Sequence, residues 1–268
     1  MSNAHRADVW AIGEAYETYV GRWSRPVARE FIDWLALPPQ GRWVDLGCGT
    51  GSLTQTILAH AEPASVIGID PSEGFLTHAR TQTHDQRARF QLGSADALPL
   101  TDSGYDAIVA GLVLNFVPHP EKAVAEMRRI LRPGGIAAAY VWDYAGGMQL
   151  MRCFWNAAVA LDPAARALDE ARRFPICNPE SLLKLFADGG FDRTECRSID
   201  VPTVFKDFDD YWLPFLGGQG PAPTYCSALT EERRAALRGQ LRLTLPIEDD
   251  GSIRMIARAW AVRGIRPD

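Results

Sequence analysis

Residues 44–51, with the sequence VDLGCGTG, constrain the fold of this chain more than any other segment. A short apolar stretch ends in an acid, and three glycines follow at alternating positions. Glycine adopts positive φ readily and lets a ligand approach the backbone closely. A strand that turns through glycines into a helix aims free backbone N–H groups at a bound ligand. The segment therefore predicts a strand, a ligand-binding turn and a helix.

The glycine spacing separates two classes of nucleotide site. A dinucleotide-binding turn follows the pattern G-x-G-x-x-G. Counted from either of the first two glycines, the third glycine position holds Ser52 or Thr54. The spacing that does fit is D-x-G-x-G-x-G, from Asp45 to Gly51. A nicotinamide-dependent dehydrogenase is therefore disfavoured.

The next segments continue an alternation of strands and helices. Residues 66–72, VIGIDPS, form a β-branched strand that ends in Asp70. This acid lies about 20 residues past the glycines, where nucleotide-binding folds place the carboxylate that holds a ribose diol. On its own, that carboxylate would suit a dinucleotide equally well. Strands that alternate with helices over residues 42–142 predict a parallel sheet with helices on both faces.

Two later motifs narrow the interpretation. The segment FQLGSADALP, residues 90–99, has the form of a third-strand end, and YDAIVAGL, residues 105–112, has that of a fourth strand. A helical stretch over residues 121–131 closes at RPGG before a fifth strand. Together the motifs resemble the class I S-adenosylmethionine-dependent methyltransferases, and the order YDAIVAGLVLNF…RRILRPGG is typical of their type 11 branch.

The resemblance implies a fold and an activity. The fold is α/β, a Rossmann-like, doubly wound seven-stranded sheet with an antiparallel last strand, helices on both faces, an N-terminal helical lid and a helical insertion before the last strand. The implied cofactor is S-adenosyl-L-methionine, and its product is S-adenosyl-L-homocysteine. The implied reaction is in-line transfer of a methyl group to O, N or C of a small-molecule acceptor.

The resemblance also assigns a cofactor site. Its glycine turn shapes the backbone beneath the methionine part, and Asp45 orders that turn or meets the amino group through water. Asp70 holds the ribose, and Asp96 with the backbone of Ala97 reads adenine. The complete set is Arg22, Asp45, Gly47, Cys48, Gly49, Gly51, Asp70, Pro71, Asp96, Ala97, Gly111 and Leu112.

The N-terminal helix admits two interpretations. Its pattern runs from Val27 to Leu35, with Ser24 as a candidate cap. In one interpretation Tyr16, Tyr19, Arg22 and Trp23 cover the methionine end of the cofactor, and Arg22 pairs with its carboxylate. In the other, the aromatic residues only anchor the helix to the body of the protein.

No residue is assigned to catalysis, because transfer from a sulfonium mainly requires alignment and exclusion of water. His119 is a weak candidate for a general base, and its place between two prolines equally fits a surface turn. Asn115 lacks the following proline of the N-P-P-[YF] motif of amino-methylating nucleic-acid enzymes. Cys48 fits a small loop residue better than a reactive thiol.

Composition restricts partners and location. The formal net charge of −5 argues against a nucleic-acid footprint. Five cysteines without a C-x-x-C pair disfavour a disulfide framework or a zinc site, and no other metal-ligand spacing occurs in the sequence. The polar residues 1–8 predict no signal peptide, and the apolar run 107–114 is too short to cross a membrane. We expect a cytoplasmic protein, either a monomer or a homodimer.

Within a single domain, the pattern predicts four parts: an N-terminal helical cap over residues 1–40, a cofactor-binding core over 41–200, a helical substrate-side insertion over 201–250, and the last core strand over 251–268. A helix capped by Asn178 precedes a strand over 191–200. Helices are expected over 208–216 and 230–243, because long structureless loops are uncommon. Two alternatives stay open: a non-catalytic S-adenosylmethionine-binding protein, and an RNA or DNA methyltransferase, which salt-dependent nucleic-acid binding would favour.

Overall fold

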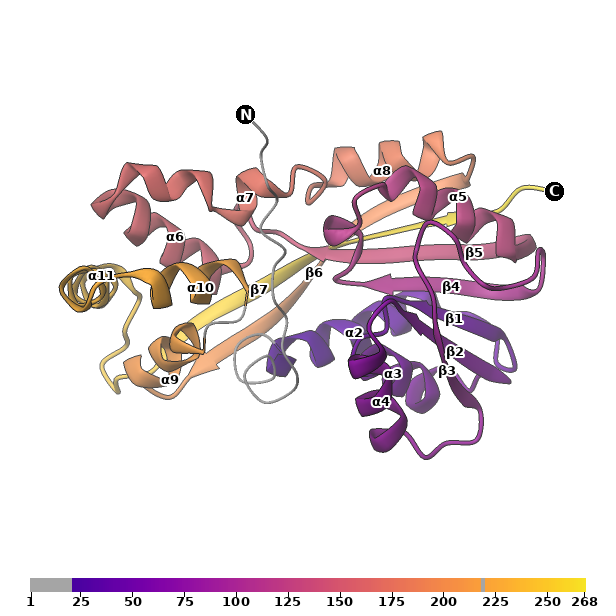
Figure 1. The fold of residues 1–268 in the computed structure, drawn as a ribbon, viewed down its shortest axis with the longest axis horizontal. Helices are drawn as coiled ribbons and strands as arrows, with labels where there is room; N and C mark the ends of the chain where they lie inside the picture. The colour runs from indigo at the N-terminus through magenta and orange to yellow at the C-terminus, as the bar shows by residue number, and fades with distance from the viewer. Residues whose placement is uncertain (1–20, 218–219) are drawn as a thin grey trace. The chain divides into compact units, whose positions relative to one another are not determined.

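A seven-stranded sheet forms the framework of the computed structural model, which describes residues 21–217 and 220–268 (Figure 1). The strands lie in the order β3-β2-β1-β4-β5-β7-β6. Strands β1 to β5 pair in parallel, and β7 pairs antiparallel with β5. The predicted Rossmann-like sheet with an antiparallel last strand is confirmed. The strands are β1 (Arg42–Leu46), β2 (Ser65–Asp70), β3 (Ala88–Leu92), β4 (Tyr105–Gly111), β5 (Leu131–Trp142), β6 (Asp192–Phe205) and β7 (Ile253–Ile265).

The chain forms two compact units. The larger comprises residues 24–143, 175–200 and 258–268, and it contains the whole of β1 to β5. The smaller comprises, of the described residues, 21–23, 144–174, 201–217 and 220–257. A segment expected in the core, residues 144–174, thus groups with the residues of the expected insertion.

Helices cover the strands of the larger unit. They are α2 (Arg22–Leu35), α3 (Ser52–His60), α4 (Glu73–Gln82), α5 (Pro120–Ile130) and α8 (Pro179–Asp188). Helices α5 and α8 pack together on one side of the strands, and α3 and α4 lie on the other (Figure 1). Val44, Ile108 and Ala138 on the central strands are fully buried, as a sheet covered on both faces requires.

Helix ends follow the expected chemistry in one case and not in another. The Asn178 side chain accepts a hydrogen bond from the Ser181 amide at 2.9 Å, which confirms it as the cap of α8. Helix α2 begins at Arg22, so Ser24 lies within its first turn and is not its cap. That expectation was wrong because the helix begins five residues before Val27, the first residue of the apolar pattern.

The smaller unit is helical around an aromatic core. Phe154 of α6 stacks on Phe215 with ring centroids 4.4 Å apart, and the Tyr211 hydroxyl donates to the Leu150 carbonyl at 3.0 Å. The expected helix over 208–216 is α9 followed by a 3-10 turn, and that over 230–243 is α11. The elements are α6 (Gln149–Leu161), η3 (Pro163–Ala167), α7 (Glu170–Arg173), α9 (Phe208–Trp212), η4 (Leu213–Leu216), α10 (Pro221–Ala228) and α11 (Glu231–Thr244).

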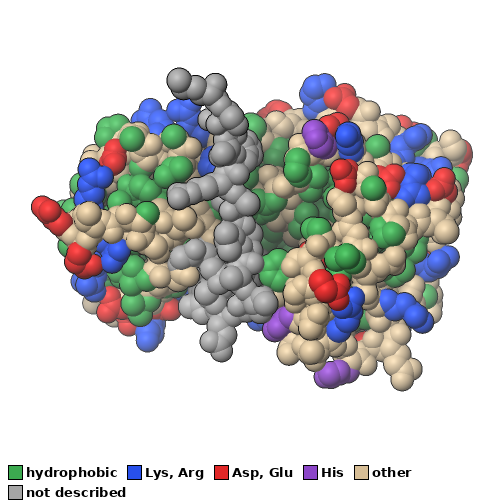
Figure 2. Space-filling view, viewed as in Figure 1, with side chains coloured by type: hydrophobic (Ala, Val, Ile, Leu, Met, Phe, Trp, Pro, Cys, Tyr) green, Lys and Arg blue, Asp and Glu red, His purple; other side chains and the backbone are tan. Residues whose placement is uncertain are grey.

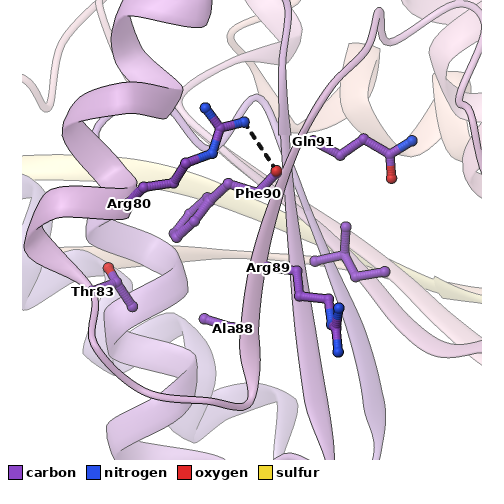
Figure 3. Close-up of a pocket in the computed structure, with 7 residues that line it drawn as sticks. Arg80, Thr83, Ala88, Arg89, Phe90 and Gln91 are labelled. Carbon is purple, nitrogen blue, oxygen red and sulfur yellow. Dashed lines mark hydrogen bonds between the residues drawn. The ribbon is translucent and has the colours of Figure 1, made fainter.

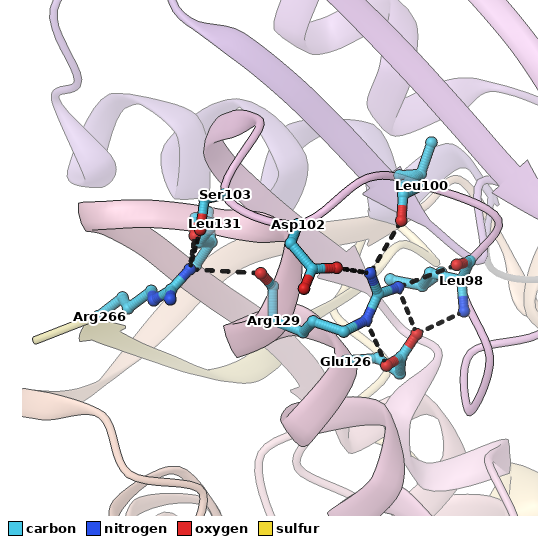
Figure 4. A network of polar contacts seen from close by, with 8 residues as sticks. All are labelled: Leu98, Leu100, Asp102, Ser103, Glu126, Arg129, Leu131 and Arg266. Atoms are coloured by element: carbon cyan, nitrogen blue, oxygen red, sulfur yellow. Dashed lines mark hydrogen bonds and ion pairs between the residues drawn. The ribbon is translucent and has the colours of Figure 1, made fainter.

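Arg129 of α5 fastens the loop that leads into β4 (Figure 4). Its guanidinium donates to the carbonyls of Leu98 and Leu100 at 3.0 and 2.8 Å. It also pairs with Asp102 at 2.5 Å and with both oxygens of Glu126 at 2.7 Å. Since this fork satisfies two backbone carbonyls and two carboxylates at once, it fixes the segment between the third-strand end and β4.

Arg129→Lys is expected to lower the free energy of unfolding by about 1–3 kcal/mol, because an ammonium cannot satisfy four partners in this planar arrangement. Chemical denaturation measures the change. Arg128→Lys is the matched control, since this exposed neighbour makes one hydrogen bond, to the Gly190 carbonyl at 3.2 Å. Equal losses in the two variants would contradict the special role of Arg129.

Candidate functional site

A glycine turn joins β1 to α3 and is fastened to the end of β2. Gly47, Gly49 and Gly51 have φ angles of 69°, 53° and 90°, in the left-handed region that favours glycine. The amides of Gly47 and Cys48 donate to the Ile69 carbonyl at 2.7 and 3.0 Å. The predicted succession of strand, glycine turn and helix is confirmed.

The glycines serve different purposes. A Cβ atom added to Gly47 would lie 2.5 Å from the methyl groups of Val113, and one added to Gly111 would lie 2.6 Å from the Tyr140 hydroxyl. These two glycines are required by packing. A Cβ on Gly49 would meet no atom of the described chain within 4 Å. The turn therefore presents its backbone to open space at Gly49.

Asp70 holds the turn from the end of β2. One carboxylate oxygen accepts the Gly49 amide at 3.0 Å, and the other accepts the Ser72 amide at 2.8 Å. Burial raises the pKa of Asp70, and the two amide hydrogen bonds counter that effect. Since each carboxylate oxygen can accept a second hydrogen bond, Asp70 can still take the hydroxyl groups of a ligand.

Asp45, at the end of β1, is buried beside the turn. Its Oδ2 accepts the hydroxyl of Thr54, in the first turn of α3, at 2.6 Å. Burial raises the pKa of Asp45 to about 7, the Thr54 hydrogen bond lowers it, and the Asp70 charge raises it further. No positively charged group among the described residues contributes to this pKa shift. An ionised Asp45 therefore has no cation beside it among those residues.

Three buried polar atoms, two of them in the segment from β1 to α3 and one in the 3-10 turn after β4, have no hydrogen-bond partner among the described residues. They are Asp45 Oδ1, Ser52 Oγ and Asn115 Nδ2. They come from the end of β1, the start of α3 and η2 (Leu114–Phe116), the 3-10 turn that follows β4. An unsatisfied buried polar atom costs roughly 1–3 kcal/mol, so the three atoms fit a site completed by a polar ligand.

The backbone is also strained after β4. Leu112 has a φ of 61°, which a leucine adopts at a cost of about 1–2 kcal/mol. Its amide donates to the Tyr140 carbonyl at 2.8 Å, and this bond holds the conformation. Strain of this kind gathers at functional sites. That Gly111 and Leu112 line a ligand stays a prediction.

Comparison with known proteins identifies the family. The profile of the "Methyltransferase domain" family matches residues 44–139. These residues belong to the methyltransferase domain family. The chain is 34% identical over 128 residues to a trans-aconitate 2-methyltransferase of Variovorax paradoxus, a match over 48% of each chain. The match thus spans about half the length of that curated relative.

Solved structures share the fold of the methyltransferase domain. A phosphoethanolamine N-methyltransferase of Haemonchus contortus, in complex with S-adenosyl-L-methionine, superposes with a TM-score of 0.60 at 15% identity, over 95% of this chain and 56% of that one. The [4+2]-cyclase SpnF superposes with a TM-score of 0.54 at 18% identity, over 89% and 80% of the two chains. At these identities the likeness concerns the fold alone.

The remaining predicted residues lie in several places. Pro71 follows Asp70 at the end of β2, and Asp96 and Ala97 lie in a turn after β3 of the methyltransferase domain. The Ser94 hydroxyl donates to Asp96 and lowers the pKa of that exposed carboxyl. Cys48 is buried, and burial raises the pKa of its thiol well above the ordinary value, which disfavours a reactive thiolate.

Arg22 and His119 already have partners. The Arg22 guanidinium pairs with Asp210 at 2.9 Å and lies over the rings of Trp23 and Phe205, all within the smaller unit. His119 is exposed at the start of α5, with Nδ1 3.3 Å from Glu121. Tyr16 and Tyr19, expected near the methionine end, lie outside the described residues.

Sequence reasoning missed Thr54, Ser52 and Val113. Thr54 is fully buried on α3, two residues after the helix begins. A threonine on the inner face of a helix that follows an acid-ending strand is a signal that could have been noticed. The close approach of Val113 to Gly47 has no local signal, because it depends on the pairing of β1 with β4.

Two further features of the described residues lie apart from the predicted cofactor site. A recess of about 470 Å³ lies along β3 and α4, where Arg80 donates to the Phe90 carbonyl at 3.2 Å (Figure 3). None of the predicted cofactor residues lines it. Residues 21–217 and 220–268 hold no group of three His, Cys, Asp or Glu side chains arranged for a metal ion, and none of their helices is long and apolar enough to cross a membrane.

Gly47→Ala is expected to lower the free energy of unfolding by roughly 2–4 kcal/mol, because the added methyl overlaps Val113 and the residue prefers a negative φ. Gly49→Ala should cost only about 1–2 kcal/mol, since backbone strain is its sole penalty. Denaturant unfolding of both variants tests the difference, and a larger loss for Gly49→Ala would refute the assignment of open space.

Proposed function

We propose that this chain is an S-adenosylmethionine-dependent methyltransferase that transfers a methyl group to a small-molecule acceptor. One observation carries the proposal: within a domain of the methyltransferase family, the glycine turn is open at Gly49 and bonded there to the buried carboxylate of Asp70. The related structure in complex with S-adenosyl-L-methionine supports this choice of cofactor.

The residues of the site would hold the cofactor by their separate chemistries. The backbone around Gly49 would lie against the methionine part, and Asp70 would accept the ribose hydroxyl groups with its free lone pairs. Asp96 and the Ala97 backbone would read adenine. Asp45 would meet the amino group, for which its unpartnered Oδ1 is suited.

The cofactor supplies a methyl group on a sulfonium, which is already an activated leaving group. The protein's part is then to hold the acceptor in line with the methyl and to exclude water. The strained segment after β4 and the glycine turn, bonded to the end of β2, would provide the frame for this alignment. His119 remains a weak candidate for a base, because it is exposed and adjoins Glu121.

A small organic acceptor agrees with the curated relative, whose name gives trans-aconitate as the molecule it methylates. On the face of the described residues that Figure 2 shows, Lys and Arg side chains are interspersed with Asp and Glu side chains. This pattern and the net charge of −5 support a small molecule over a nucleic acid. We further propose that residues 1–40 form a cap over the cofactor and that residues 201–250 lie on the acceptor side.

A cytoplasmic location is part of the proposal and is supported by five unpaired cysteines. The choice between a monomer and a homodimer stays open. Binding without methyl transfer is the competing function, because the [4+2]-cyclase shares the fold and its name describes a different reaction. Turnover therefore has to be tested separately from binding.

The decisive experiment is a calorimetric titration of the purified protein with S-adenosylmethionine, S-adenosylhomocysteine and NAD in parallel. We expect micromolar binding of the first two and none of the third. Binding of NAD alone would refute the proposal. Methyl transfer to candidate carboxylic acids, followed by release of S-adenosylhomocysteine, then separates an enzyme from a binding protein.

Asp70→Asn is expected to weaken the binding of S-adenosylhomocysteine by about 10- to 100-fold, since hydroxyl groups bond a charged carboxylate more strongly than an amide. Asp85→Asn is the matched control, because this carboxylate lies between α4 and β3 and pairs with Arg87 at 2.7 Å. Calorimetry on both variants makes the comparison. Unchanged affinity for Asp70→Asn would remove Asp70 from the ribose site.

Gly49→Ala offers a second test on a folded protein. Its methyl would enter the space that is open in the structure, so the variant should lose only about 1–2 kcal/mol of stability, stay folded, and yet bind S-adenosylhomocysteine at least about tenfold more weakly. Full retention of affinity would show that the ligand does not lie against Gly49.

A further inference from the structure

Thr54 and Asp45 form a buried hydrogen-bonded pair in which one carboxylate oxygen of Asp45 has no partner among the described residues. Thr54 is fully buried and Asp45 is 1% exposed. The Thr54 hydroxyl has a single hydrogen, and it is donated to Asp45 Oδ2 at 2.6 Å. This bond fixes the orientation of the carboxylate. Oδ1 is then buried with no partner among the described residues.

Among residues 21–217 and 220–268, no positive charge contributes to the pKa shift of Asp45. On the neighbouring strands, Asp45 lies opposite Gly68 of β2 and Val109 of β4, which do not titrate. The charged group that faces it from the end of β2 is Asp70, another carboxylate. In the glycine turn, burial keeps the Cys48 thiol in its neutral form. The described residues therefore leave Asp45 able to accept a cationic group of a ligand when it is ionised.

We propose that Thr54 is a positioning residue, which holds the Asp45 carboxylate so that Oδ1 faces a cationic group of the cofactor and makes cofactor binding depend on pH. The inference rests on the proposed function. It extends the proposed cofactor site to Thr54, whose side chain need not touch the cofactor. It also predicts that binding depends on pH, since Asp45 can bind the cation only after it has lost its proton.

The direction of the pH effect follows from the charge on Asp45. With a pKa of about 7 in the ligand-free site, Asp45 is protonated at lower pH. Binding of an ammonium group there releases the carboxyl proton to the buffer. Affinity should therefore fall as pH falls, by about tenfold for each pH unit below 7, and level off as Asp45 becomes fully ionised.

Thr54→Val removes the hydroxyl and keeps the shape of the side chain. The hydrogen bond that favours ionised Asp45 is then lost, so the midpoint of the pH profile should move upward by about one unit. Thr54→Ser keeps the hydroxyl and should leave the midpoint unchanged. A role in packing alone would reduce affinity without moving the midpoint.

The measurement is calorimetric titration with S-adenosylhomocysteine between pH 6 and pH 9, in buffers of different ionisation enthalpy so that released protons are counted. Asp45→Asn, which cannot titrate, should give a flat and weaker profile. It separates Asp45 from Asp70, whose pKa burial also raises. Should Thr54→Val fail to fold, the wild-type and Asp45→Asn profiles still decide the dependence on Asp45.

The expected result is a pH-dependent wild type, an upward shift for Thr54→Val and none for Thr54→Ser. A flat wild-type profile, a Thr54→Val midpoint equal to that of the wild type, or a persistent pH dependence in Asp45→Asn would overturn the inference while leaving the proposed function intact. Failure of the wild type to bind at every pH would overturn both.

Discussion

The bond between Asp70 and the glycine turn is the contact on which the site depends. The carboxylate joins the turn after β1 to the start of α4, because it accepts the amides of Gly49 and Ser72 at once. It can do so only while β1 and β2 keep their register, in which Leu46 lies opposite Ile69. Gly68 of β2 has no room for a side chain, since an added Cβ would lie 2.7 Å from the Phe90 ring on β3.

Local patterns predicted most of the frame, and long-range contacts account for what they missed. The glycine turn, the acid-ending strands and the Asn178 cap depend on residues close in sequence, so a sequence reveals them. Arg22 has its ion-pair partner 188 residues away, at Asp210, and no local pattern points to it. The association of residues 144–174 with residues 201–257 is likewise a property of the folded chain.

The site carries a cost to stability that a ligand would relieve. The pKa of Asp45 rises from 3.8 to about 7 on folding, so ionisation of this group destabilises the fold progressively as pH rises between these values. By linkage the loss reaches roughly 4 kcal/mol once Asp45 is fully ionised. Strain at Leu112 and the unpartnered atoms of Ser52 and Asn115 act in the same direction.

The three glycines of the turn share a spacing and a positive φ, and they answer to different constraints. Gly47 is fixed by Val113, which lies two residues after the end of β4, the strand paired with β1. Gly51 begins α3, and a Cβ there would lie 3.3 Å from Ala79 of α4. Only Gly49 of these three borders no atom of the described chain within 4 Å at its Cβ position. A motif read as one ligand-binding signature thus combines two glycines that build the sheet-to-helix connection with one whose requirement is best explained by a ligand.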